Sequence, residues 1–488
     1  MVLALAPRAV SATTRLVFPD GSGDYPSIQA AIDSSVTGDS ILLADGTYRD
    51  IDPLGIIPWG KDLTFRSVSG NPEACIIDAE GGYGFNISHG ETRACRVEAL
   101  TVCNASGQFG GGIHIRGAAP TISGCTIRDN WGSDGGGIFA YQLSGPRIEN
   151  CHIYGNACSW YEGLGGGMYL QGDSLEVVGC TIENNDAGSI GEGVGGGICA
   201  SGKILIQDCV IRNNVAGTAG GGCAISGYST VENCKLYGNT AGLLGGGFAL
   251  FTSPWAGVTI TGTTIVDNAA PEGAALVNRN AFVGYENGPA LLDRCLVTDQ
   301  KGITPPFASN FANSLITLSC SDVFGNQGGD WVGGIAGQFG VEGNFSADPL
   351  FCDPDGGVYT LSSASPCLPA HNECGVLVGA LGQGCTATAV AETSPAAAVT
   401  LANHPNPFNA HTRIDFATPA AGSVDLRVYD LQGRELMRLL DGEWVGAGAH
   451  SLDWDGRDAH GNRLPSGVYP CRLRSAAGEA SLKLILLQ

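Results

Sequence analysis

The sequence predicts an all-β protein in which a long β-solenoid precedes a small β-sandwich. Glycine accounts for 75 of the 488 residues, and each Gly inside a helix costs about 1 kcal/mol relative to Ala. A Cys-x-Ile-x-x-Asn motif followed by Gly-Gly-Gly recurs with a spacing of 25 to 32 residues, a period typical of solenoids. Near the end of the chain, short alternating strands between Gly, Asp and Pro turns replace this repeat, as expected for a sandwich.

The repeat favours strands over helices. In each copy the Cys and the Ile stand two residues apart, which is the alternation of a strand with one buried face. Gly triplets allow tight corners between closely stacked coils and are unfavourable for the helices of other solenoids. The clearest copies are CTIRDN at 125–130, CHIYGN at 151–156, CTIENN at 180–185, CVIRNN at 209–214 and CKLYGN at 234–239.

Stacking these copies predicts two rows of side chains. The cysteines should form an inward row of small apolar side chains, with a ladder of metal sites as the alternative, although no coil supplies convergent His or carboxylate ligands. The asparagines should close turns by pairing with backbone groups. The two rows are Cys125, Cys151, Cys180, Cys209 and Cys234, and Asn130, Asn156, Asn185, Asn214, Asn239 and Asn268.

Composition divides the chain into four parts. The start has a short apolar run without basic residues before it, which indicates a truncated export leader or an irregular terminus. Next, Ile28, Ala31 and Ile32 share one helical face, so this helix should cover the first coil. An Ala/Thr/Pro-rich stretch predicts a linker. The predicted divisions are a leader at 1–17, a solenoid at 18–385 with its capping helix at about 25–36 and a Cys-rich end at 350–385, a linker at 386–402 and a sandwich at 403–488.

The segment DYPSIQAAIDSSVTGDSILLADGTY at 24–48 resembles the start of right-handed parallel β-helix proteins of the pectate-lyase-like superfamily. The paired Ile-x-x-Asn and Gly-Gly-Gly-Ile elements resemble the repeats of polymorphic outer-membrane adhesins. The resemblance covers residues 18–385 and implies a right-handed parallel β-helix. It leaves activity open, because the superfamily contains lyases, hydrolases, esterases and proteins without known chemistry.

The C-terminal part is similar to the sorting modules of surface proteins that use type IX secretion, and to the immunoglobulin-like domain of flagellar hook-capping proteins. This resemblance implies export to the outer-membrane surface or the exterior of a bacterium, with the secretion machinery as a partner. A sandwich that only spaces the solenoid from another structure is the alternative. The motifs are PNPFN at 405–409, VYD at 428–430 with Gly433 and Arg434, WDGRD at 454–458 and SGVY at 466–469.

The charge of the protein excludes two classes of partner. With 25 basic and 47 acidic residues the net charge is −22, so nucleic acids and anionic membrane surfaces would be repelled. No apolar stretch approaches the roughly 20 residues that span a bilayer. We therefore expect no transmembrane segment.

The variable loops at 157–164 and 186–194 should overhang neighbouring coils and form a wall. Aromatic rings stack on sugars, and carboxylates accept hydroxyls, bind Ca²⁺ or act as acid and base. Solvated loop residues are the alternative interpretation. The ligand-binding candidates are Trp131, Trp160 and Tyr161, the catalytic candidates are Glu162, Glu192, Asp186 and Asp134, and Asp186 and Glu192 are the candidates for Ca²⁺, the single cofactor considered.

Side chains that flank the repeated Ile provide a second candidate site. They point outward and mix cations with rings, which suits an extended acidic polysaccharide. An exposed sheet face without any ligand would look similar. The candidates in this outward row are Arg128, Tyr154, Arg212 and Tyr237.

Four cysteines lie outside the repeat, namely Cys352, Cys367, Cys374 and Cys385. Their close spacing near the last coil predicts two disulfides, for which three pairings are open. The active-site patterns of polygalacturonases and of calcium-dependent pectate lyases are missing. The leading hypothesis is an exported surface protein that binds a polysaccharide or another surface polymer. A polysaccharide lyase or glycoside hydrolase is the first alternative, and a non-catalytic adhesin or structural stalk is the second.

Overall fold

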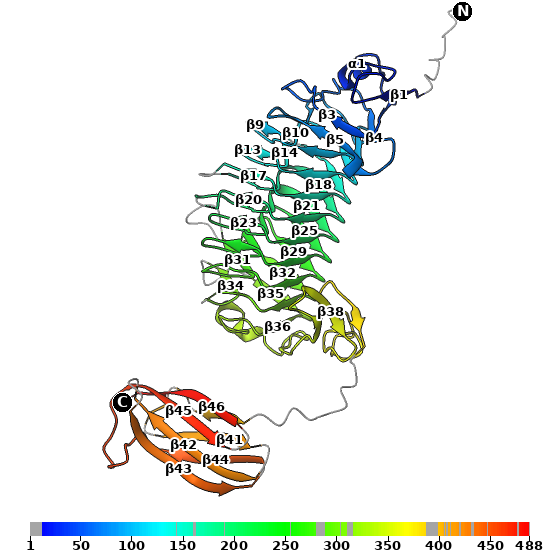
Figure 1. Ribbon diagram of the computed structural model, residues 1–488. Coiled ribbons are helices and arrows are strands. Elements are labelled where there is room, and N and C mark those ends of the chain that lie inside the picture. Colours follow the sequence, from blue (N-terminus) through cyan, green and yellow to red (C-terminus); the bar gives the residue numbers. More distant parts are fainter. Residues whose placement is uncertain are drawn as a thin grey trace, which may run out of the picture. The chain divides into compact units, whose positions relative to one another are not determined.

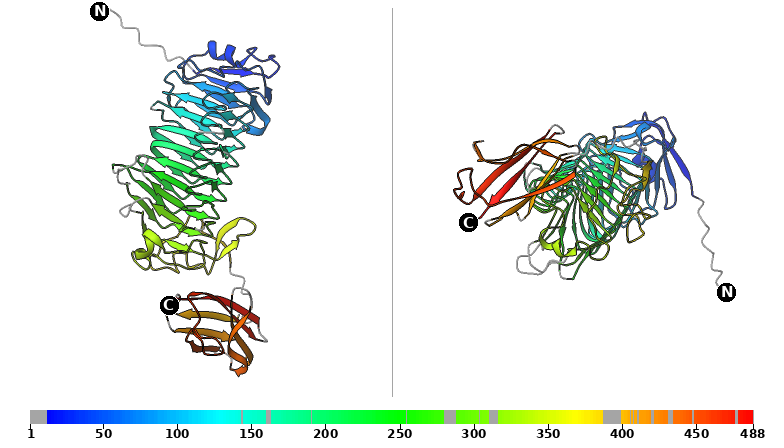
Figure 2. Two further views of the ribbon diagram at one scale, coloured as in Figure 1. Left: turned by 90° about the vertical axis from the view of Figure 1, so that its left-hand side faces the viewer. Right: turned by 90° about the horizontal axis from the view of Figure 1, so that it is seen from below.

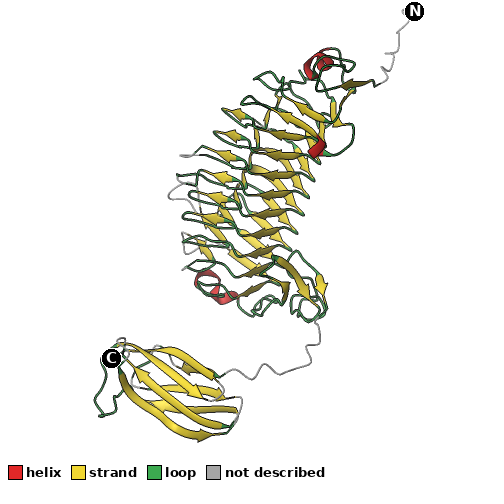
Figure 3. Ribbon diagram, in the orientation of Figure 1, coloured by secondary structure: helices red, strands yellow, loops and turns green. Residues whose placement is uncertain are grey.

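The computed structural model describes residues 12–487, apart from 143, 160–162, 190, 254, 280–287, 303, 310–315, 387–398, 405, 407, 410, 419–420, 431–433, 447 and 476–477. The chain forms two compact units, residues 1–386 and 387–488. Strands dominate both units (Figure 3), which confirms the all-β prediction. No helix among the described residues is long and apolar enough to cross a membrane.

The first unit is a stack of parallel coils (Figure 1). Its largest sheet has 19 strands in two rows, and β18 (Met168–Val178) and β21 (Ile198–Gln207) run through both rows. One row contains β1 (Thr14–Val17), β2 (Ser40–Leu43), β4 (Thr64–Ser67), β7 (Arg96–Glu98), β11 (Thr121–Ser123), β15 (Arg147–Glu149), β25 (Ser229–Glu232), β29 (Val258–Thr261), β32 (Ala290–Asp293) and β35 (Ile316–Ser319). The other row contains β6 (Phe85–Ile87), β10 (Ile113–Arg116), β14 (Ile138–Tyr141), β24 (Cys223–Ser226), β28 (Phe248–Phe251), β31 (Leu276–Arg279) and β34 (Phe307–Ser309).

Two further parallel sheets complete the coils (Figure 2). The 11-stranded sheet contains β3 (Gly46–Tyr48), β5 (Cys75–Asp78), β8 (Thr101–Cys103), β12 (Thr126–Arg128), β16 (His152–Tyr154), β19 (Thr181–Glu183), β22 (Val210–Arg212), β26 (Lys235–Tyr237), β30 (Thr264–Val266), β33 (Leu296–Thr298) and β36 (Asp322–Phe324). The six-stranded sheet contains β9 (Ser106–Gly107), β13 (Trp131–Gly132), β17 (Ala157–Cys158), β20 (Asp186–Ala187), β23 (Val215–Ala216) and β27 (Thr240–Ala241).

A buried asparagine ladder joins successive coils, as predicted. The side-chain amide of Asn156 donates to the carbonyl oxygen of Ile127 at 2.9 Å and to Oδ1 of Asn185 at 3.0 Å. The same Oδ1 accepts the backbone N–H of Asn156 at 3.0 Å. Each amide thus satisfies backbone groups that would otherwise be buried without partners. The same bonding links Asn130, Asn156, Asn185, Asn214, Asn239 and Asn268.

The Gly triplets lie where coils approach too closely for a side chain. A Cβ on Gly196 would lie 2.4 Å from the carbonyl oxygen of Gly221, and one on Gly197 would lie 2.7 Å from that of Gly222. These distances are well inside van der Waals contact, so Gly is required there.

The five cysteines of the predicted inward row are free and buried, as the apolar interpretation predicts. The thiol of Cys125, for example, donates to the carbonyl oxygen of Val97 at 3.4 Å. Among the described residues, no group of three or more His, Cys, Asp or Glu side chains is arranged to hold a metal ion.

The N-terminal end of the stack is covered by α1 (Ile28–Asp33), shorter than the helix expected at 25–36. Ser27 caps it by accepting the N–H of Ala30, and Ile28, Ala31 and Ile32 are buried. The predicted leader boundary at residue 17 is wrong, because Thr14–Val17 form β1 and pair with β2 in the first coil. Residues 1–11 of that segment lie outside the described residues. A short 3₁₀ helix, η1 (Pro72–Ala74), precedes β5.

The other end is covered by a segment that we call the C-terminal cap, residues 333–385. It contains the 3₁₀ helix η2 (Gly333–Gln338) and the strands β37 (Phe351–Asp353), β38 (Val358–Ser362) and β39 (Gln383–Cys385). Leu361, Cys367 and Val378 pack on Leu296 of β33. The backbone N–H of Ala380 also donates to the hydroxyl of Thr264 on β30 at 2.9 Å. The cap therefore folds back over the outer face of the 11-stranded sheet at its last coils.

Two disulfides hold the cap, Cys352–Cys385 and Cys320–Cys374. The expectation for Cys367 is wrong, because Cys367 is a free buried thiol 3.4 Å from a carboxylate oxygen of Asp322. Burial raises the pKa of Asp322 to about 7. The partner of Cys374 is Cys320, which lies at the turn before β36.

The second unit is an antiparallel sandwich of two sheets. Phe408, Trp454 and Tyr469 lie in its own hydrophobic core. Residues 387–398 of the predicted linker lie outside the described residues, and β40 begins at Thr400, within the range predicted as linker. The strands are β40 (Thr400–His404), β41 (Thr412–Thr418) and β44 (Gly448–Trp454) in one sheet, and β42 (Gly422–Tyr429), β43 (Glu435–Val445), β45 (Gly467–Ser475) and β46 (Gly478–Leu486) in the other.

Replacing Asn185 by Ala should lower the free energy of unfolding by about 3 kcal/mol, because buried backbone groups on both neighbouring coils lose their partners. Its neighbour Asn184 is exposed with φ +53°, so Asn184→Gly should change stability by less than about 0.5 kcal/mol. Urea unfolding of both variants measures the difference. Equal effects at the two positions would contradict the ladder's role.

Candidate functional site

An aromatic ladder lies on the outer face of the 19-stranded sheet. His114 of β10, Phe139 of β14 and Tyr169 of β18 are in register on successive coils. The ring centroids of His114 and Phe139 are 5.4 Å apart, and those of Phe139 and Tyr169 are 5.3 Å apart, with interplanar angles of 14° and 19°. Because successive coils are in register, equivalent aromatic side chains lie one above the other and their rings stack.

This stacking decides which rings can meet a ligand. The faces of Phe139 are covered by its two neighbours, and the residue is only 6% exposed. Phe109 and Tyr141 flank the ladder and are 41% and 40% exposed. A groove of about 340 Å³ lies between these elements. The groove is lined by Phe109, His114, Arg116, Asp134, Phe139, Tyr141 and Tyr169.

Asp134 and Arg116 are the charged groups of this aromatic groove. Burial raises the pKa of Asp134 above its ordinary value, although its carboxylate accepts the N–H of Leu164 at 3.0 Å. Arg116 donates from Nε to the side-chain oxygen of Gln142 at 2.8 Å. Burial lowers the pKa of His114, which favours its neutral form. The groove therefore offers rings, one carboxyl group and one guanidinium.

Those loop candidates that the structure describes lie on different elements. Asp134 lies in the aromatic groove, whereas Trp131 and Asp186 lie on β13 and β20 of the six-stranded sheet. Glu192 is exposed. The carboxylate of Asp186 accepts the N–H and the hydroxyl of Ser189, both at 2.8 Å. Of the remaining candidates, Trp160, Tyr161 and Glu162 lie outside the described residues.

The outward row on the 11-stranded sheet is engaged in internal contacts. Arg128 forms an ion pair with Asp129 at 2.6 Å, and its register partner on the next coil is Tyr154. Arg212 donates to Glu183 and, at 2.9 Å, to the hydroxyl of Tyr237.

Glu183 lies between two donors of this row. Its carboxylate contacts Nε2 of His152 at 2.7 Å as well as Arg212. Burial alone would raise the pKa of Glu183, but these hydrogen bonds outweigh it and lower the pKa. The ring of Tyr237 also packs 5.1 Å from that of Tyr359 in the C-terminal cap. This face therefore offers fewer free groups than the aromatic groove.

Sequence reasoning identified Asp134 and missed the other six of the seven residues that line the groove, because it followed the inward-facing positions of the repeat. Three of the missed residues share a signal, because the second position after each Gly triplet is aromatic in the early coils and small in the later ones. That position is occupied by His114, Phe139, Tyr169, Cys199, Ala224 and Ala249. The switch from rings to small side chains marks one end of the groove.

Comparison with known proteins supports the architecture. The family model described as "Right handed beta helix region" matches residues 63–241 and 167–345, and that of the FlgD Ig-like domain matches residues 404–479. No curated protein matches the chain.

Two solved structures are similar to parts of the chain. Pectate lyase Pel9A has 15% identity and a TM-score of 0.45, and the match covers 77% of this chain and 98% of that one. Dimeric latent PorU from Porphyromonas gingivalis has 20% identity and a TM-score of 0.15 over 18% of this chain. The second match spans 9% of the PorU chain.

The two kinds of ring in the groove should respond differently to mutation. Phe139→Ala should destabilise the first unit by about 3 kcal/mol, because it leaves a cavity between two stacked rings. Phe109→Ala should cost less than about 1 kcal/mol, because that ring is largely exposed. Thermal and urea unfolding measure both variants. A large loss of stability in Phe109→Ala would show that Phe109 is part of the packing rather than a free ring.

Proposed function

Because the chain belongs to the right-handed β-helix family, we propose that it binds a polysaccharide along the outer face of its coils, outside the cell that produces it. The observation that carries this proposal is the aromatic groove, where two exposed rings flank a half-buried carboxyl group. Rings pack against the apolar faces of sugars, and carboxyl and guanidinium groups pair with their hydroxyls. A volume of about 340 Å³ is at the lower end for ligand pockets, which suits a short segment of a longer chain.

Two features support an extracellular location. The cap holds two disulfides, and such bonds persist in oxidising compartments. The net charge of −22 keeps the protein away from nucleic acids and anionic membranes. A binding protein or adhesin is favoured over a simple stalk because a stalk needs no exposed rings in a groove.

Catalysis by a polysaccharide lyase or glycoside hydrolase is the second candidate, and Asp134 is the residue that favours it. A carboxyl group whose pKa is raised by burial is suited to proton transfer. Glycoside hydrolysis normally needs a second carboxyl group across the bond, and Asp134 is the single carboxyl group among the residues that line the aromatic groove. The groove is thus better suited to binding.

Replacing Phe109 or Tyr141 by Ala should weaken polysaccharide binding about five- to tenfold each, the scale of one ring contact of about 1 kcal/mol. Calorimetry against a panel of plant and bacterial glycans measures the affinity. Trp444→Ala, which removes an exposed ring of the second unit, is the control and should leave affinity unchanged.

Assays for reducing ends and unsaturated uronides on the same samples test for turnover. Turnover that Asp134→Asn abolishes would replace the binding proposal by the enzymatic one. Equal binding by the wild type and by the Phe109 and Tyr141 variants would remove the groove from consideration.

We infer that the second unit directs export, as type IX sorting modules do. It has a hydrophobic core of its own and matches the FlgD Ig-like domain over residues 404–479. A unit that folds alone can serve as a signal without disturbing the coils.

Deleting residues 403–488 should leave the protein inside the producing cell, with its β-helix intact. Fractionation with protease accessibility locates the protein, and circular dichroism checks its strand content. Trp444→Ala in the full chain is the control for handling. Normal surface display of the deletion variant would contradict the sorting role and leave the spacer interpretation.

A further inference from the structure

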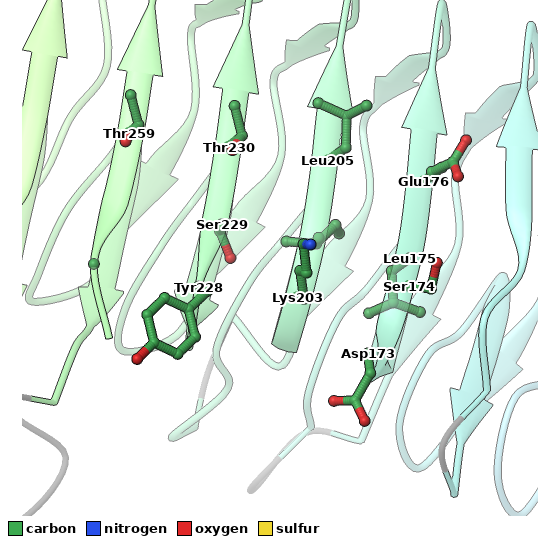
Figure 4. Close-up of a pocket in the computed structure, with 12 residues that line it drawn as sticks. Asp173, Ser174, Leu175, Glu176, Lys203, Leu205, Tyr228, Ser229, Thr230 and Thr259 are labelled. Carbon is green, nitrogen blue, oxygen red and sulfur yellow. The ribbon is translucent and has the colours of Figure 1, made fainter. Parts of the chain in front are cut away.

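A second groove lies on the same 19-stranded sheet, at the corner where its two rows of strands meet. Its volume is about 420 Å³. Figure 4 shows Asp173, Lys203 and Tyr228 side by side on three successive coils, with Glu176, Leu205, Thr230 and Thr259 in a row beyond them. We call this set of residues the corner groove.

Exposed aromatic residues mark this corner. Tyr228 is 60% exposed. Trp255, two residues before the lining residue Gly257, is 80% exposed. Large exposed rings on neighbouring coils have no role in packing the core, and they offer the flat apolar surface that pyranose rings contact.

The charges of the corner groove fall into two groups. Glu176 is held by Arg93 at 2.6 Å and by Arg147, so its carboxylate is already engaged. Asp173 and Lys203 form no ion pair within the described part of the chain. One free carboxylate beside one free ammonium can accept from and donate to adjacent sugar hydroxyls without adding net charge.

The corner groove is connected to the aromatic groove through one strand. Tyr169 of the aromatic groove and Asp173 of the corner groove both belong to β18. Four residues along a strand span about 13 Å, which is within reach of a polymer of a few sugar residues.

We propose that the corner groove is a second sugar subsite, which takes an uncharged pyranose of the same polymer that occupies the aromatic groove. Tyr228 contacts the apolar face of the sugar, and Asp173 and Lys203 bind adjacent hydroxyls. An anionic sugar is disfavoured because Asp173 offsets Lys203. The choice of a sugar as ligand rests on the proposed function.

The test compares trisaccharides and hexasaccharides of β-1,4-glucan, β-1,4-xylan and β-1,4-mannan with hexagalacturonate by calorimetry. Lys203→Ala and Tyr228→Ala should each weaken binding of an uncharged hexasaccharide about tenfold and leave trisaccharide binding in the aromatic groove unchanged. Arg66→Ala removes an exposed cation of β4 and is the matched control.

The outcomes separate the two sites. Wild-type affinity in the Lys203 and Tyr228 variants together with loss in Phe109→Ala would overturn the corner subsite and keep the aromatic groove. Loss in the Lys203 and Tyr228 variants with no loss in Phe109→Ala or Tyr141→Ala would support the corner groove and overturn the aromatic one. Preference for hexagalacturonate would overturn the uncharged ligand, and failure of the wild type to bind any probe would overturn both sites.

Discussion

In-register stacking of parallel coils is the constraint on which the rest of this structure depends. Each residue of a coil lies about 4.8 Å from its equivalent in the next coil, so a position is filled by a row of side chains rather than by one. Such a row is stable only if its members can pack against one another and pair their polar groups. The asparagine ladder does so by hydrogen bonding from Asn156 to Asn185 and onward, and the Gly triplets do so by leaving room for carbonyl oxygens.

The same constraint shapes the outer surface. The rings of a row on the outer face stack on one another. The two faces of the Phe139 ring are therefore covered by His114 and Tyr169 and cannot contact a ligand. Free binding surface arises where a row is interrupted. Rings off the row remain exposed, as with Phe109 and Tyr141, and the row ends where Cys199 follows Tyr169 in register. The corner groove has the same origin, because Asp173, Lys203 and Tyr228 occupy equivalent corners with different chemistry.

Those considerations explain what sequence reasoning could and could not predict. The inward rows were predictable because the core accepts few residue types, so Cys, Ile and Asn return at a readable period. The grooves were not, because they combine side chains from different coils and their residues vary from coil to coil. The Cys320–Cys374 bond was missed for a related reason. Cys320 stands at the turn before β36, one position before the ladder position that Ser321 occupies in this coil, and its bond depends on the cap, which returns 54 residues later in the chain.

The cap also helps to determine which face of the β-helix is free to bind a polymer. It covers the outer face of the 11-stranded sheet from Thr264 onward, and Tyr359 reaches Tyr237. Upstream of that point, the carboxylate of Glu183 is already bonded to His152 and Arg212. A polymer on that face would therefore have to displace existing ion pairs at a cost in free energy. The 19-stranded sheet carries both grooves, and each has exposed rings. In the corner groove Asp173 and Lys203 form no ion pair among the described residues, so a polymer on this sheet would displace fewer ion pairs.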